Sequence, residues 1–452
     1  MIKIYIPNNN ILERKYIIDI LFGEFLGLDY KLIIDNGELK INDWIIELEN
    51  ANKLIVEDHF FNKYPNNLEY LKEENIPKTI EFGKNDFIVE DNIPIIYGSS
   101  AFSLLPSTLI CGIDIFASSF FMLTRWEEYV NKNRDNHDRF PAYESLAYKN
   151  NFLDRPVVNE YVEMVKNMLL YLGLNQKPRI KNYQLILTHD VDEIVMWRSW
   201  KQIFRVALGD VVKRRNIKLA FSRIKEYILI QQGKIKDPFD TFDWLIDKSE
   251  SIGVKSRFYF MSGGVTEFDN KYKIDDERTI KLINHIKKRG HIVGFHPSYN
   301  AYNDTIQFKK EKEALEKASK SKIREGREHY LRFEVPTTWQ IWADNGLEVD
   351  STCGYADKEG FRCGTGDEFS VFNILSREKL KLKERPLVYM DDSHYSYHKN
   401  IDTKKSFKIV ESIIHRQKKY HSKTTLLFHN SIFANNFRVN FVTLYEQLLG
   451  PK

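Results

Sequence analysis

The pattern of apolar and polar positions along the chain changes near residue 180. Short strand-like and helical segments come before it, and a regular alternation of strands and helices follows. Before it, residues 2–6 alternate like a half-buried strand, and residues 11–26 and 114–129 repeat apolar side chains at helical spacing. Further short strands are expected at residues 32–34, 44–48 and 95–97. Residues 1–180 are therefore predicted to form a small α/β domain with connecting helices.

Beyond residue 180, apolar strand-like segments alternate with amphipathic helical ones up to about residue 430. Strands are predicted at residues 185–187, 256–261, 291–296, 330–333, 350–356, 387–390 and 425–429. Helices are predicted at residues 279–289 and 308–320. This alternation predicts a parallel sheet with helices outside it, and seven or eight strands favour a barrel. Residues 181–452 are interpreted as this second domain.

A basic insertion at residues 197–236 interrupts the first strand-to-helix connection and is too long for a simple loop. Nine Lys or Arg residues lie between residues 198 and 225, against the single Asp210. An apolar helical stripe accompanies them: Ile217, Ala220, Phe221, Ile224 and Ile228. Such a helix can lie on an anionic membrane or guide an anionic substrate, although a solvated face on a packed helix is the commoner meaning of the pattern.

The amino-acid composition limits the classes of function and the cellular compartment that are expected for this chain. The 452 residues include 67 Lys and Arg against 63 Asp and Glu, so a net charge of +4 gives no general argument for nucleic-acid binding. Three cysteines are too few for a disulfide framework and fit a reducing compartment. The N-terminal MIKIYIPNNN has no apolar core of a signal peptide, and no stretch of eighteen apolar residues occurs. A cytoplasmic protein is expected, with contact to the inner membrane face through the basic insertion as an open interpretation.

The segment LILTHDVD, residues 185–192, ends a predicted buried strand in two carboxylates. Because side chains repeat every two residues in a strand, Asp190 and Asp192 can face the same small volume. Carboxylates that share a pocket repel unless a cation lies between them or one keeps a proton. The pair therefore suggests a metal site with a neighbouring general base. Helix capping, or pairing with Arg198 and Lys201, is the alternative.

Other predicted strand ends in the same half carry histidines. The segment GHIVGFHPSYN places His296 at the end of its predicted strand. Histidine is a good zinc ligand by type, although His296 could also be an ordinary core histidine. TLLFHN ends in His429, whose ordinary pKa near neutral suits proton donation to a leaving amine.

Two further segments carry candidate site residues. EHYLRF contains His329 and Arg332, of which at most one can reach a shared pocket if the strand is regular. Arg332 would suit pairing with a catalytic carboxylate. The glycine-rich residues 350–365 are interpreted as a loop that approaches a ligand closely.

Together these motifs resemble the polysaccharide deacetylase family of carbohydrate esterases over residues 184–435, in a bacterial branch with an additional N-terminal domain. The resemblance implies a distorted (β/α)7 barrel and one divalent metal ion, often zinc, that serves the hydrolysis of an N-acetyl or O-acetyl group on a sugar. It implies Asp190 as general base, Asp192 and His296 as metal ligands, Arg332 as the arginine that orients the base, and His429 as general acid.

The family usually has a second metal histidine four residues after the first, where this chain has Asn300. Asparagine is a poor zinc ligand, so either His329 or a water supplies the third position, or the site binds metal weakly, or catalysis has been lost. The predicted partner is a carbohydrate: a nucleotide sugar, a lipid-linked glycan or a cell-surface polysaccharide, with no nucleic acid. A non-catalytic glycan-binding or scaffolding protein that retains the barrel is the alternative, and Asn300 is its best support.

Overall fold

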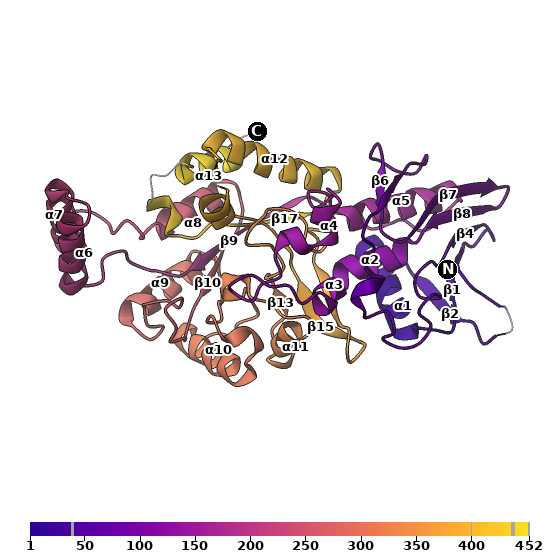
Figure 1. Cartoon of the computed structure of the whole chain (residues 1–452), viewed down its shortest axis with the longest axis horizontal. Coiled ribbons are helices and arrows are strands. Elements are labelled where there is room, and N and C mark those ends of the chain that lie inside the picture. Colours follow the sequence, from indigo (N-terminus) through magenta and orange to yellow (C-terminus); the bar gives the residue numbers. More distant parts are fainter. Residues whose placement is uncertain (38–39, 399, 435–438, 451–452) are drawn as a thin grey trace.

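The computed structural model describes residues 1–37, 40–398, 400–434 and 439–450, which form a mixed α/β protein with two main sheets (Figure 1). The N-terminal sheet has six strands in the order β2-β1-β3-β4-β8-β7. Its strands are β1 (Ile2–Ile6), β2 (Tyr30–Ile34), β3 (Trp44–Glu47), β4 (Lys53–Val56), β7 (Gly98–Leu105) and β8 (Thr108–Ile113). A separate pair comprises β5 (Glu81–Gly83) and β6 (Ile93–Ile95).

The N-terminal helices follow the apolar periodicity closely. They are α1 (Ile11–Ile18), the π-helix η1 (Asp19–Leu26), α2 (Ile115–Thr124), α3 (Trp126–Val130), α4 (Leu146–Lys149) and α5 (Val157–Tyr171), with short turns η2 (Glu73–Asn75) and η3 (Ala142–Glu144). The predicted helix 11–26 is helical throughout and ends at Gly27, whose φ of 65° suits a left-handed cap. The predicted helix 114–129 is broken at Arg125, which has a φ of 53°.

The second sheet has nine strands in the order β14-β15-β13-β12-β11-β10-β9-β17-β16. They are β9 (Gln184–Val191), β10 (Arg257–Phe260), β11 (Ile292–Phe295), β12 (Glu325–Gly326), β13 (Val349–Asp350), β14 (Phe369–Asn373), β15 (Glu378–Glu384), β16 (Leu387–Met390) and β17 (Lys423–Leu427). All neighbours pair in parallel except β14, which runs antiparallel to β15. The sheet is curled, and among the described residues its end strands β14 and β16 do not pair with each other.

Helices cover the outside of this sheet, with α9, α10 and α11 on one side and α12 and α13 on the other in Figure 1. The C-terminal helices are α6 (Trp200–Val212), α7 (Ile217–Gln231), α8 (Phe242–Ser251), α9 (Glu277–Lys288), α10 (Thr305–Ser319), α11 (Thr337–Asp344), α12 (Thr403–Lys419) and α13 (Phe441–Leu449). The short 3-10 turns η4 (Ala301–Asn303), η5 (His329–Leu331) and η7 (Ile432–Ala434) and the π-helix η6 (Ser393–Tyr397) complete the set. In the described part of the chain, no helix is both long enough and apolar enough to span a bilayer.

Three predicted strands are wrong in position. Of the predicted strand 95–97, only Ile95 lies in a strand, as the last residue of β6. Residues 330–333 contain no strand, because the chain makes the single turn η5 there and Tyr330 and Leu331 adopt φ values of 59° and 55°. The strand of this region is β12, which ends at Gly326. Only Asp350 of the predicted strand 350–356 is extended in the sheet, as the last residue of β13.

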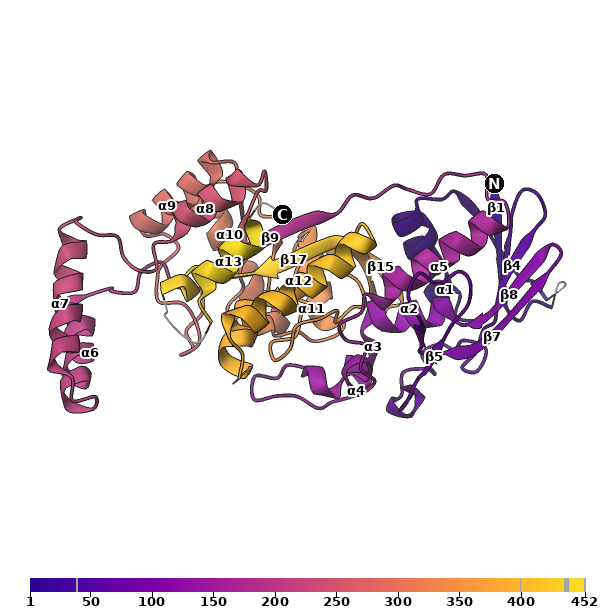
Figure 2. The ribbon, with the colours of Figure 1, turned by 90° about the horizontal axis from the view of Figure 1, so that it is seen from above.

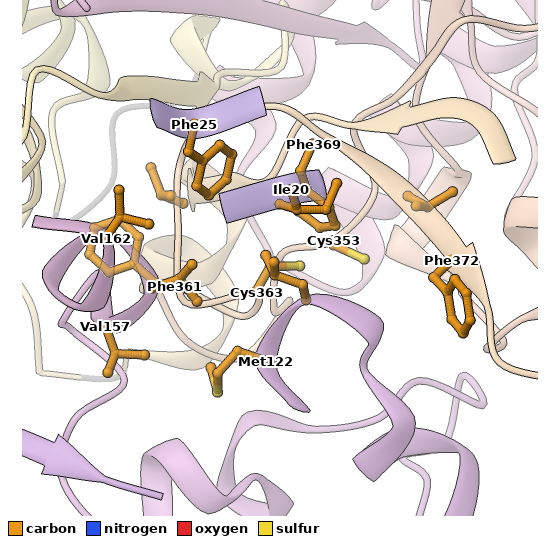
Figure 3. Close-up of a cluster of buried hydrophobic side chains, with 14 of the residues drawn as sticks. Ile20, Phe25, Met122, Val157, Val162, Cys353, Phe361, Cys363, Phe369 and Phe372 are labelled. Atoms are coloured by element: carbon orange, nitrogen blue, oxygen red, sulfur yellow. The ribbon is translucent and has the colours of Figure 1, made fainter. Parts of the chain in front are cut away.

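One continuous hydrophobic core joins the two sheets. Figure 3 shows side chains of η1, α2 and α5 packed around Cys353, Phe361 and Cys363 of the glycine-rich loop. The three cysteines, Cys111, Cys353 and Cys363, are buried and free. The core therefore fixes this loop against the N-terminal sheet and its helices.

The insertion 197–236 forms the helical hairpin α6–α7, which stands away from the rest of the molecule (Figures 1 and 2). It has its own small apolar cluster, centred on Trp197, Ile203 and Tyr227, separate from the main core. Asp210 is fully buried in the hairpin and pairs with Arg214 and Arg223. The hairpin is therefore held together by its own contacts.

Candidate active site

The carboxyl ends of adjacent strands bring most of the predicted site residues around one cavity of about 460 Å³. Asp190 is the second-last residue of β9, and Asp192 follows that strand directly. His296 follows β11, and His429 lies two residues after β17. His329 comes from the turn after β12 and also lines the cavity.

Asp192, His296 and His329 form a compact group of possible metal ligands whose ligand atoms all lie within 4.8 Å of one another. His296 Nε2 is 2.9 Å from His329 Nδ1. Asp192 Oδ1 lies 3.4 Å from the first nitrogen and 3.7 Å from the second. Two ligands of a tetrahedral zinc ion with bond lengths of about 2.0–2.1 Å lie roughly 3.3 Å apart, so the spacing fits such an ion.

Backbone carbonyls orient both histidine rings. His296 Nδ1 lies 2.7 Å from the backbone oxygen of Arg327, and His329 Nε2 lies 2.9 Å from that of Phe268. Because a carbonyl oxygen only accepts hydrogen bonds, each of these nitrogens carries a proton and donates it. In the neutral rings, the lone pairs therefore belong to the two nitrogens that face each other and Asp192.

The environment of Asp192 also fits a cation. Its Oδ1 is buried and has no hydrogen-bond donor among the described residues. Burial acts to raise the pKa of Asp192, but His329, His296 and His429 together hold that pKa well below its ordinary value. An ionised carboxylate and two lone pairs directed at one point are a suitable donor set for a divalent metal. His329, rather than Asn300, lies in the third position.

Asp190 is oriented by Arg327, and the sequence prediction that Arg332 does this is wrong. The fully buried Arg327 donates from Nη1 to Asp190 Oδ1 at 2.9 Å. Its Nε also donates to the backbone oxygen of Ser351 at 2.8 Å, which fixes the guanidinium. Arg327 directly follows β12, so a correct placement of that strand in the sequence would have identified it.

Arg332 lies in a separate cluster away from the carboxylate pair. It donates to Asp138 Oδ2 and to the backbone oxygen of Tyr299, each at 2.7 Å, and to Asn300 Oδ1 at 3.2 Å. Its guanidinium also stacks over Tyr299 and Tyr302, each at 4.1 Å from the ring centroid. Arg332 and Asn300 therefore contact each other and the segment that carries Asp138, and Arg332 does not meet Asp190.

His429 is paired with Asp391, a residue that the sequence analysis missed. Its Nδ1 donates to Asp391 Oδ1 at 2.7 Å, and its backbone N–H donates to Oδ2 at the same distance. Burial acts to lower the pKa of His429, but Asp391 and Asp192 raise it well above the ordinary value. His429 Nε2 lies 3.7 Å from Asp192 Oδ2. The ring therefore directs Nε2 toward Asp192, beside the group formed by Asp192, His296 and His329.

Several cavity residues come from segments in which no motif of the sequence predicted a site. The polar segment 131–151 contributes His137 and Arg139, and η6 contributes Tyr395 and Tyr397. Arg139 Nη2 donates to the Tyr397 hydroxyl at 2.6 Å, which links these two segments. The expected glycine-rich wall is wrong, since no residue from 350 to 365 lines the cavity. Its glycines instead make close contacts with the protein, as Gly364 does with Val157 and Val158.

Comparison with known proteins gives only distant likenesses. A family model described as a family of unknown function, DUF7033, matches residues 2–173. A crystal structure of a putative polysaccharide deacetylase from Mycobacterium smegmatis is 14% identical, with a TM-score of 0.39, over 61% of this chain and 85% of that one. A mutant CE4 family pseudoenzyme with restored enzymatic activity is 11% identical, with a TM-score of 0.29, over 59% of this chain and 62% of that one. No curated protein matches the chain. These likenesses are too weak to assign a function, which therefore has to be argued from the site.

Proposed function

We propose that this chain is a metal-dependent hydrolase that removes an acetyl group, most simply an N-acetyl group, from a sugar of a bacterial cell-surface polysaccharide or its precursor. The observation that carries the proposal is the Asp192, His296 and His329 donor set lying beside Asp190 and His429 in one cavity. The polysaccharide deacetylase resemblance of the strand-end motifs agrees with this chemistry. On the same grounds the curled sheet is interpreted as a distorted (β/α)7 barrel, with residues 1–180 as an N-terminal α/β domain packed against it.

Asp190 suits the role of general base. Its Oδ1 is held by Arg327, while its Oδ2 lies 4.0 Å from His296 Nε2, toward the proposed metal position. A carboxylate held in this way can accept a proton from a water that attacks the acetyl carbonyl carbon. A bound divalent cation would polarise that carbonyl and make the water more acidic.

His429 suits the role of general acid. Asp391 accepts the hydrogen bond from Nδ1–H, so when the ring is protonated its second proton is on Nε2, the nitrogen that faces Asp192. Transfer of this proton to the departing sugar nitrogen completes the cleavage of the carbon–nitrogen bond. The products are acetate and an amino sugar, or acetate and a sugar hydroxyl if an ester is the substrate. Tyrosines 330, 395 and 397 line the cavity, and their rings can pack against a sugar ring.

The test is acetate release from a panel of acetylated nucleotide sugars, lipid-linked glycans and polysaccharide fragments. The wild-type chain should release acetate, lose that activity on chelation and regain it with zinc. Asp192→Ala should abolish activity and remove the metal ion held with His296 and His329, whereas replacing the exposed Asp275 with Asn should change neither. A chain that binds glycans but holds no metal would instead support the non-catalytic alternative.

The α6–α7 hairpin supports a second part of the proposal, peripheral contact with an anionic membrane. One face of α6 exposes Trp200, Phe204, Leu208 and Val211, with exposed fractions of 40% to 63%. Lysines and arginines are exposed beside it: Lys201, Arg205, Lys213, Arg214, Arg215 and Lys218. Apolar side chains next to exposed cations match the interface of a bilayer with anionic headgroups. Such contact would suit a lipid-linked carbohydrate substrate.

Vesicle binding tests the hairpin. The full chain should bind vesicles that contain phosphatidylglycerol and not vesicles of phosphatidylcholine alone. At about 1 kcal/mol for each cation, replacing the exposed Lys213, Arg215 and Lys218 with Gln should weaken binding roughly 100-fold, and Arg214 is kept because it pairs with the buried Asp210. The matched control replaces Lys404, Lys405 and Lys408, exposed on α12, and should keep full binding. Equal binding by the two triple variants would contradict the proposal.

A further inference from the structure

A second group of metal-ligating side chains lies outside the residues that line the active-site cavity. Glu359 belongs to the connection between β13 and β14, His394 lies in the π-helix η6, and His398 directly follows it. Their ligand atoms all lie within 4.8 Å of one another. The two histidines are four residues apart, so a single turn brings both rings to the carboxylate of a distant segment.

The spacing of these atoms matches a small cation. Glu359 Oε2 is 3.0 Å from His398 Nε2 and 3.4 Å from His394 Nε2. Both values are close to the roughly 3.3 Å between two ligands of a tetrahedral zinc ion. The other carboxylate oxygen, Oε1, is paired with Lys358 Nζ at 3.1 Å. Oε2 is therefore the oxygen left for the two histidines.

All three facing atoms are buried without a hydrogen-bond partner among the described residues: Glu359 Oε2, His394 Nε2 and His398 Nε2. The two nitrogens lie at ion-pair distance from the oxygen, but neither has the alignment of a good hydrogen bond to it. A buried polar atom left unsatisfied costs about 1–3 kcal/mol, so three of them at one point call for a shared partner. The His398 side chain is 20% exposed, which leaves an open side for a water ligand.

We propose that Glu359, His394 and His398 bind a second divalent cation of the zinc type. Two imidazoles and one carboxylate are a donor set that zinc accepts, with water in the fourth position. Magnesium and calcium prefer oxygen ligands throughout, so they fit this set less well.

The position of this group suggests what the cation does. Within η6 and the residue before it, Asp392, Tyr395 and Tyr397 line the active-site cavity, whereas His394 and His398 meet Glu359. A cation there would fix this segment against the loop that carries Glu359 and so position one wall of the cavity. These ligands are positioning residues, because they do not reach the proposed reacting atoms.

Metal content of the full-length chain tests the proposal. After chelation and reloading with zinc, the wild type should hold two equivalents for each chain. His394→Ala combined with His398→Ala should hold one, and so should the isosteric variant Glu359→Gln. The variant without the first site, His296→Ala with His329→Ala, should also hold one, and adding His398→Ala should remove it. The matched control His415→Ala, an exposed histidine on α12, should keep two.

Thermal unfolding gives a readout that does not depend on activity. In the His296→Ala and His329→Ala variant, a chelator should lower the melting temperature, and this shift should vanish when Glu359→Gln is added. A folded His296→Ala and His329→Ala variant that holds no zinc would overturn the second site and show Glu359 to be a simple ion-pair partner of the histidines. Absence of acetate release would leave this result unaffected, so the two proposals fail separately.

Discussion

The Asp190→Asn variant is expected to release acetate about 10² to 10⁴ times more slowly than the wild-type chain while keeping its bound metal. Asparagine has nearly the same shape as aspartate and can still accept the hydrogen bond that Arg327 donates to Asp190 Oδ1. It cannot accept a proton from the attacking water. The loss should therefore appear in kcat, with little change in KM and in the zinc content of the purified protein.

Two comparison variants separate the base from the metal. Asp192→Ala should lose activity and the zinc equivalent of this site, because it removes a ligand atom from the group formed with His296 and His329. Arg332→Lys should retain most of the activity, since Arg332 contacts Asp138 and the backbone of Tyr299 and does not contact Asp190. Zinc loss in Asp190→Asn equal to that in Asp192→Ala would assign both carboxylates to the metal and would leave the reaction without a base at this position.

The polar residues at strand ends could be predicted from the sequence because each strand is an apolar run followed by a charged or histidine side chain. Asp190, Asp192, His296 and His429 follow this pattern, and the parallel sheet brings them to one edge. His329 was named only as a substitute for Asn300, and the structure places it beside the other two ligand atoms.

The residues that orient these side chains could not be predicted in the same way. β12 has only two residues in the sheet, too few for an apolar period, so the strand was placed too late and Arg332 was chosen instead of Arg327. Asp391 lies 38 positions before His429, and its pairing depends on β16 and β17 lying side by side.

The arrangement of the sheets was also only partly predictable. Alternating strands and helices indicated a parallel α/β sheet, whereas the antiparallel β14 and the pairing of β9 with β17 depend on contacts between distant segments. The same holds for the polar, charge-rich residues 131–151, which place His137 and Arg139 in the cavity wall. Charge-rich segments of this kind have no periodic signal that shows where they dock.

The Glu128→Gln variant is expected to lose about 3–5 kcal/mol of unfolding free energy, because it breaks a buried ion-pair network. Glu128 Oε1 accepts hydrogen bonds from Arg125 Nε and from Arg362 Nε, both at 2.8 Å. All three side chains are at most 2% exposed. The network joins α3 to the glycine-rich loop, so its loss leaves Arg362 buried without its carboxylate.

The matched control is Glu144→Gln, which breaks an exposed pair with Lys149 and should cost less than about 1 kcal/mol. Urea denaturation of each full-length variant measures the difference. Replacing both Glu128 and Arg362 with Met should be less destabilising than Glu128→Gln alone, since no unpaired charge then stays at position 362. A Glu128→Gln variant as stable as Glu144→Gln would show that the network adds nothing to the junction.

The same network predicts how stability depends on acid. Burial acts to raise the pKa of Glu128, but Arg362 and Arg125 lower it to about 2, below the ordinary value of 4.5. A carboxyl group with a depressed pKa in the folded state stabilises the fold above pH 4.5, and this contribution is lost as the pH falls from 4.5 toward 2. The shift corresponds to about 3 kcal/mol, in line with the cost expected for the variant. The unfolding free energy of the wild type should therefore fall more steeply over this pH range than that of Glu128→Gln. Parallel pH profiles for the two proteins would show that the apolar core, and not the ion-pair network, stabilises this junction.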